Sequence, residues 1–136
     1  MNTVKVKTFT ANVTLGLLRQ YSNQKISLSE FKTALLRAQE HTKATLNVAL
    51  SAKINPCEIV FLGQEEPSME VNFIQYPKFP HEENTLKKAI IQLTKLLMRE
   101  LDQNRVVIVF SDETIMLEQS EAIDRKIKIE AREKQP

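Results

Sequence analysis

The side chains with the clearest chemical potential are cationic and aromatic. Tyr76 and Lys78 belong to the stretch Tyr76-Pro77-Lys78-Phe79-Pro80, whose prolines fix the backbone just ahead of an expected helix. A cation held next to a helix N-terminus favours anions, so this loop could line an anion pocket or contact a partner. The alternative is a rigid strand-to-helix connection in which Phe79 caps the core.

Arginine residues complete the set of candidate ligand-binding groups. Arg19 and Arg105, together with Tyr76, are polar groups that could bind the carboxylate of a small substrate. No residue has a pattern that identifies it as catalytic. The sequence therefore offers four candidate ligand-binding residues, namely Arg19, Tyr76, Lys78 and Arg105.

Other chemically capable residues have simpler explanations. His81 precedes Glu82–Glu83, but adjacent side chains diverge at a helix start, and no partner is spaced to complete a metal shell. Cys57 has no neighbour in sequence that would clearly lower its pKa, which favours a buried structural thiol. The acidic pairs Glu65–Glu66 and Asp112–Glu113 could do acid–base chemistry, but they fall at turns, where solvated carboxylates are routine. We therefore expect no metal and no cofactor.

Composition excludes several classes of function. The chain has 136 residues and a formal net charge of +2, and its 19 basic and 17 acidic residues are mixed, whereas nucleic-acid binding needs a clustered basic face. With 2 glycines and 1 cysteine, it can form no glycine-rich phosphate loop, internal disulfide or cysteine-based zinc cluster. No apolar run approaches the roughly 20 residues that span a bilayer, and no signal-peptide core is present. We expect a cytoplasmic protein that binds neither nucleic acid nor membranes.

The first half of the chain predicts a strand, a helix and a second strand. Residues 3–15 are rich in residues that favour extended structure. A capping box at Ser27-Leu28-Ser29-Glu30 begins a helix that has an apolar stripe and ends near His41-Thr42. Residues 46–54 alternate between apolar and polar or small side chains, which is typical of a half-buried strand, and Asn55-Pro56 ends that strand.

The second half predicts a hairpin, a long helix and a returning strand. The strands at 57–63 and 69–76 flank a turn at 64–68. In the helix after Pro80, apolar residues recur at helical spacing, so Leu93 at the centre of their stripe should be fully buried against the sheet. The stripe and the later extended segments comprise Leu86, Ile90, Leu93, Leu97 and Leu101, then residues 105–110 and 114–117.

These elements predict one α+β domain over residues 1–118 and a charged C-terminal tail over residues 119–136. Their order is that of a β-α-β-β-α-β sandwich with two helices packed on one face of a sheet. A ferredoxin-like domain has the same element order and is the alternative fold. Ile123 and Ile127 lie at helical spacing in the tail, which is either solvated or ordered on a neighbouring subunit.

The stretch from Glu70 to Leu117 resembles the second half of subunits of the tautomerase superfamily, which includes the macrophage migration inhibitory factor fold. In that family too, a strand leads through a loop into an amphipathic helix and then into a strand like Arg105-Val106-Val107-Ile108-Val109-Phe110. The resemblance implies a tautomerase-like fold. Tautomerases use an N-terminal proline as the base, whereas this chain begins Met1-Asn2-Thr3, so proline-based tautomerisation is not expected.

The predicted function is that of a small homo-oligomeric α+β domain that binds a ligand or a protein. One face of the sheet has no further element to cover it, so we expect copies of the chain to bury that face in a homo-oligomer, most simply a trimer. The alternative is a tautomerase-like enzyme that acts on a small carboxylate with non-standard residues. A third hypothesis is an accessory subunit whose charged tail engages another protein.

Overall fold

A computed structural model describes residues 1–120 of the chain. Residues 121–136, and with them almost all of the predicted tail, lie outside the described residues. Five antiparallel strands form one sheet in the order β2-β3-β1-β4-β5. In chain order the elements are β1 (Thr10–Gly16), the short 3-10 helix η1 (Arg19–Tyr21), α1 (Leu28–Leu46), β2 (Lys53–Phe61), β3 (Gln64–Ile74), α2 (Glu83–Glu100), β4 (Arg105–Phe110) and β5 (Thr114–Glu118).

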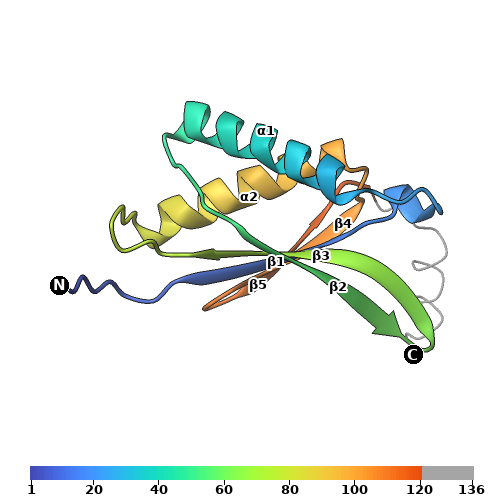
Figure 1. Cartoon of the computed structure of the whole chain (residues 1–136), viewed down its shortest axis with the longest axis horizontal. Helices are drawn as coiled ribbons and strands as arrows, with labels where there is room; N and C mark the ends of the chain where they lie inside the picture. Colours follow the sequence, from blue (N-terminus) through green and yellow to red (C-terminus); the bar gives the residue numbers. More distant parts are fainter. Residues whose placement is uncertain (121–136) are drawn as a thin grey trace.

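Both α-helices lie on the same face of the sheet, which leaves the opposite face without a helix (Figure 1). The helix α1 joins β1 to β2, and β3 lies between these two strands. The helix α2 joins β3 to β4, which are separated by β1 in the same way. The predicted α+β sandwich with two helices on one face is confirmed, and its split connectivity is that of the ferredoxin-like alternative with β5 added at the edge.

The core lies between the helices and the sheet because side chains alternate between the two faces of each strand. In β1, Ala11, Val13 and Leu15 are buried, whereas Asn12 and Thr14 are only partly buried. The same alternation in β3 and β4 sends one apolar row of each strand toward the helices. The prediction for α2 is confirmed, since Leu93 is 0% exposed. The buried residues of β3 and β4 on the helical face of the sheet are Met69, Val71, Phe73, Val106, Ile108 and Phe110.

The helix α1 begins as predicted but runs further. The Ser27 hydroxyl accepts a hydrogen bond from the Glu30 backbone N–H, and Glu30 accepts one from the Ser27 N–H, which forms the capping box. The helix continues to Leu46, where Asn47 ends it in the left-handed conformation with φ 56°. The predicted strand at 46–54 is therefore wrong over most of its length. Its alternation reflects an extended connection whose apolar side chains enter the core, such as Val48.

Strand boundaries also shift in the hairpin and at the N-terminus. The strand β1 begins at Thr10 rather than at residue 3. Pro56 lies inside β2 instead of ending a strand before it, which is tolerated because β2 is at the edge of the sheet. The hairpin turns at Leu62 and Gly63, not at 64–68, with φ 48° and 83°. Two residues with positive φ match the type I′ turn that suits the twist of a hairpin, and glycine adopts such a φ without strain.

Candidate functional site

The face of the sheet that no helix covers carries polar side chains at its centre. Asn12 and Thr14 come from β1, and Glu70 and Asn72 come from β3. The register pairs Asn12 with Asn72 and Thr14 with Glu70, so the four side chains form one cluster across the two central strands. All four are partly buried.

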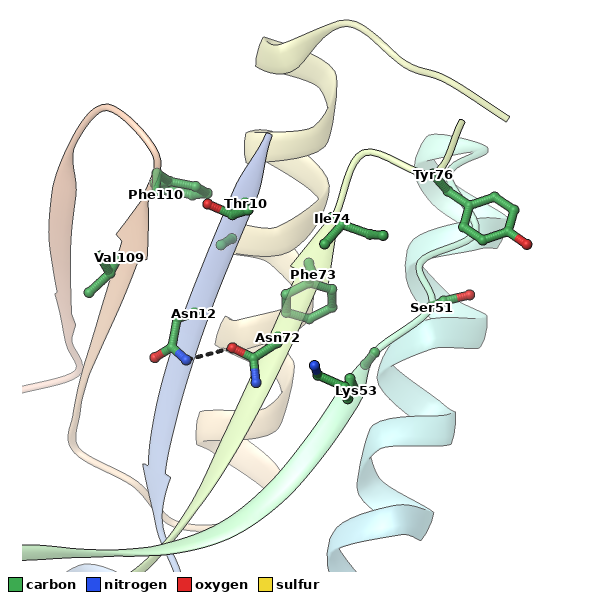
Figure 2. A pocket seen from close by; sticks show the side chains of 12 residues that line it. Thr10, Asn12, Ser51, Lys53, Asn72, Phe73, Ile74, Tyr76, Val109 and Phe110 are labelled. Carbon is green, nitrogen blue, oxygen red and sulfur yellow. Dashed lines mark hydrogen bonds between the residues drawn. The ribbon is translucent and has the colours of Figure 1, made fainter. Parts of the chain in front are cut away.

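Hydrogen bonds within this cluster all run toward the Glu70 carboxylate. The Thr14 hydroxyl donates to Asn12 Oδ1 at 3.4 Å. Asn12 Nδ2 donates to Asn72 Oδ1 at 2.6 Å, as Figure 2 shows. Asn72 Nδ2 then donates to Glu70 Oε1 at 3.2 Å. We call these four residues the donor chain. It fixes the position of a carboxylate near the middle of an otherwise open sheet face.

A cavity of about 620 Å³ is lined by Asn12 and Asn72, the two middle residues of the donor chain. Figure 2 shows Asn12, Asn72 and Lys53 extending from the neighbouring strands β1, β3 and β2. The remaining lining is mostly apolar and includes Phe73 and Phe110. A cavity of this size, with apolar walls and a few polar groups, is typical of a site for a small organic ligand.

A second cavity, of about 430 Å³, lies at the Thr14 end of the donor chain. It is lined by Thr14, which belongs to the donor chain, and by Gly16 at the end of β1. Its other polar groups come from η1, from β3, from the connection between α2 and β4, and from the first residue of β4. The two cavities therefore follow each other along β1, the first at residues 10–12 and the second at Thr14 and Gly16. Besides Thr14, the polar lining of the second cavity comprises Gln20, Glu66, Ser68, Asp102, Gln103, Asn104 and Arg105.

Tyr76 and Lys78 hold different positions in the strand-to-helix loop. Tyr76 lies at the rim of the first cavity and stacks on Phe79, with ring centroids 6.1 Å apart, and its hydroxyl points away from Asn12 (Figure 2). Lys78 is exposed, with Nζ 5.9 Å from the centroid of the Phe79 ring. Phe79 is itself 64% exposed, so it does not cap the core.

Arg19 and Arg105 are each engaged by carboxylates. Arg19 donates to Asp102 at 2.9 Å and to Glu30 at 3.1 Å, and these hydrogen bonds raise the pKa of its guanidinium. Arg105 Nε donates to Glu118 at 2.7 Å, beside the second cavity. The four sequence candidates are thus not gathered at one site. Their roles in ligand binding stay predictions, and of the four only Tyr76 lines the first cavity and only Arg105 the second.

Sequence reasoning missed the donor chain, because asparagine and threonine on a strand match no catalytic motif. The available signal was strand parity, since Glu70 and Asn72 alternate with Met69, Val71 and Phe73. Cys57 lies near this cluster, and partial burial, followed by the charge of Glu70, raises the pKa of its thiol. Within residues 1–120, no three His, Cys, Asp or Glu side chains gather to hold a metal ion.

Comparison with known proteins identifies the fold. No protein-family model and no curated protein sequence matches the chain. Among similar solved structures, a phage SAM lyase in the apo state has a TM-score of 0.65 and 14% identity, covering 82% of this chain and 90% of that one. A phage SAM lyase in complex with S-methyl-5'-thioadenosine has a TM-score of 0.62 and 12% identity, covering 88% and 95%. The chain has the fold of a SAM lyase.

This likeness contradicts the resemblance to the tautomerase superfamily. The pattern from Glu70 to Leu117 describes any strand, helix and strand in succession, and it does not specify which strands become neighbours. Here β1 lies between the two strands that α2 connects. The predicted ligand- or protein-binding module, with a tautomerase-like enzyme as its alternative, is wrong for the same reason. As for membranes, no helix among residues 1–120 is long and apolar enough to cross a bilayer.

Proposed function

We propose that this chain binds S-adenosylmethionine (SAM) on the uncovered face of its sheet and cleaves it to S-methyl-5'-thioadenosine. The observation that carries this proposal is the donor chain, which connects Glu70 to Asn12 and Asn72 in the wall of a cavity of about 620 Å³. The likeness to a phage SAM lyase, one structure of which holds S-methyl-5'-thioadenosine, supports it.

The first cavity is the proposed site for the adenosine part of the substrate. Asparagine amides match adenine because one amide can pair with both N6 and N7 of the base. Asn12 and Asn72 offer such amides at the cavity wall. Apolar side chains of the same face, Ile74 and Val109, form surfaces against which a flat base can pack.

Glu70 is the proposed partner of the sulfonium group. A positive sulfur next to a carboxylate in a partly buried site is attracted more strongly than it would be in bulk water. S-methyl-5'-thioadenosine carries a neutral sulfur and does not gain this attraction. Glu70 would therefore favour the substrate over the nucleoside product, which helps the product to leave.

The cleavage breaks the bond between the sulfonium sulfur and Cγ of the methionyl chain. The electron pair of that bond moves to sulfur, which leaves as the neutral thioether. The four-carbon fragment completes its valence by one of two routes: Glu70 removes a proton from Cβ, or the fragment's own carboxylate oxygen attacks Cγ. Both routes balance without water, and in both the protein contributes chiefly by holding the reacting groups in line.

Chromatography of SAM incubated with the purified protein tests the proposal. We expect S-methyl-5'-thioadenosine to form, and Glu70→Gln to lower kcat/KM by about 100-fold or more because a charge partner is lost. A fall in kcat would favour proton removal by Glu70, whereas a rise in KM alone would favour sulfonium binding. The control is Glu65→Gln, an exposed residue of the same strand. The proposal would be overturned if the purified protein neither turned over SAM nor bound the thioadenosine.

Homo-oligomerisation through the same face is a second part of the proposal. Val107, Val109 and Met116 are exposed apolar residues of β4 and β5, and in the register Val107 lies opposite both Thr14 and Met116. Burial of this apolar area between copies would stabilise an assembly, for which a trimer is the proposed form. The proposed location is the cytoplasm.

A further inference from the structure

Two acceptor oxygens converge on the backbone of Gly16 in the second cavity. A Cβ on Gly16 would lie 2.8 Å from Gln103 Oε1 and closer still to Glu66 Oε1. The φ angle of Gly16 is not in the left-handed region, so close approach, rather than backbone conformation, requires glycine there. The absent side chain leaves the space into which both oxygens reach.

Gln103 is held so that its carbonyl oxygen faces this space. The residue is 7% exposed, and its Nε2 donates to the Leu18 carbonyl at 2.9 Å and to the Leu101 carbonyl at 3.0 Å. Among the side chains that the structure describes, no hydrogen-bond donor contacts Gln103 Oε1 or the Glu66 carboxylate. Two unpartnered oxygens that point at one place form a site for a group rich in N–H donors.

Asn104 supplies a group of the opposite polarity in the same cavity. It is 4% exposed, and its Oδ1 accepts a hydrogen bond from the Ser120 backbone N–H at 3.0 Å. Its Nδ2 has no partner among the described residues. A buried donor without an acceptor is unfavourable, and a ligand oxygen would relieve this. The cavity therefore combines acceptors with a donor, as the ammonium and carboxylate of an α-amino acid require.

We infer that the second cavity binds the amino-acid end of the substrate, with its ammonium between Glu66 and Gln103 and its carboxylate near Asn104. This inference rests on the proposed function. From Asn12 to Gly16 the strand advances about 13 Å, at roughly 3.3 Å per residue. An extended SAM molecule has a comparable length from adenine to ammonium. Its sulfonium then falls between the two cavities, where the register sets Glu70 opposite Thr14.

Binding measurements with two nucleosides test this inference separately from the proposed function. S-methyl-5'-thioadenosine has no amino-acid end, whereas S-adenosylhomocysteine has both ends and a neutral sulfur. Calorimetry should show that Glu66→Gln weakens binding of S-adenosylhomocysteine by about tenfold or more, while affinity for the thioadenosine stays within about twofold. Gly16→Ala should give the same pattern, because its methyl group displaces both oxygens.

Glu65→Gln is the matched control, since Glu65 precedes Glu66 on the same strand and is exposed. It should change neither affinity. If Glu66→Gln alters both affinities equally, or neither, the amino-acid site is wrong while the nucleoside site stands. If the wild-type protein binds neither nucleoside, the proposed function and this inference both fail. Circular dichroism of each variant excludes loss of fold, and Glu66→Gln carries the test should Gly16→Ala not fold.

Discussion

Asn12 Nδ2 donates a 2.6 Å hydrogen bond to Asn72 Oδ1, between the two central strands and on the face that the helices leave open. The backbone ladder already joins these strands, so the sheet does not depend on this side-chain bond. Its effect is to orient the Asn72 amide, whose Nδ2 can then donate to Glu70. The pair thus connects the wall of one cavity to the carboxylate in the middle of the face.

Asn72→Ala should remove the central link of this chain. We expect affinity for S-methyl-5'-thioadenosine to fall about tenfold, because the adenine loses one amide and Asn12 loses its acceptor. Thermal stability should change little, since Asn72 lies on the open face. Asn55→Ala on β2 is the control, because Asn55 is an exposed residue of the same type on the same face, opposite Glu70. Equal losses in the two variants would contradict the role given to Asn72.

Leu93→Ala should destabilise the fold by about 2–5 kcal/mol, because Leu93 is fully buried and its truncation leaves a cavity. Lys95→Ala, two residues away on the exposed side of α2, should stay within about 0.5 kcal/mol. Urea unfolding of both variants measures the difference. Similar midpoints would show that α2 packs in another orientation.

The sequence predicted α2 well because its apolar stripe, seen at Leu93 and Leu97, has a period that only a helix buries on one side. It failed between residues 46 and 54, where an alternating pattern belongs to a connection rather than a paired strand. Alternation indicates which side chains enter the core, but it does not indicate whether the backbone pairs with a neighbouring strand. The order of strands in the sheet depends on such pairing and was not contained in the pattern.

Ser27→Ala should destabilise α1 by about 1 kcal/mol, since it removes the acceptor for the Glu30 backbone N–H. Ser29→Ala is the matched control, because Ser29 is an exposed serine in the first turn of the same helix. The Ser29 variant should unfold within about 0.5 kcal/mol of the wild type. Chemical denaturation of both proteins measures the difference, and equal losses would mean that the cap adds nothing.

The turn after β4 should make stability depend on pH. Lys87 donates to Asp112 at 2.9 Å, and this hydrogen bond lowers the pKa of the Asp112 carboxyl. A carboxyl with a lowered pKa in the folded state adds stability above its unfolded pKa and loses it as pH falls through the folded value. Asp112→Asn should therefore lower Tm near about pH 6 and make little difference by about pH 2.

A Lys87→Met background supplies the control for this pH effect. Without the ammonium, the Asp112→Asn substitution should shift Tm by the same small amount at both pH values. Lys87 also lies over the Phe110 ring, with Nζ 5.3 Å from the centroid, so Lys87→Met alone should lower Tm. A pH dependence that survives in this background would assign the effect to another group.

The candidate site was harder to predict than the fold, because the role of each residue depends on where the fold places it and not on a sequence motif. Arg19 is a strong chemical candidate in the sequence, yet its guanidinium joins the η1 loop to Glu30 and Asp102. Glu66 looked like a solvated turn residue, because the hairpin was expected to turn at 64–68. The actual turn at Leu62 and Gly63 puts Glu66 within a paired strand, opposite Ile59 and next to Gly16.

The uncovered face should also carry an interface between copies of the chain. Val109 and Met116 are 46% and 55% exposed on its β4–β5 side, so a charge at either position would have to be buried in the assembly. Val109→Lys and Met116→Lys should each convert the proposed trimer to monomers in light scattering at micromolar concentration. Leu36→Lys is the control, because Leu36 is 53% exposed on α1, in the helical layer. A wild-type monomer at high micromolar concentration, or dissociation by Leu36→Lys alone, would contradict assembly through this face.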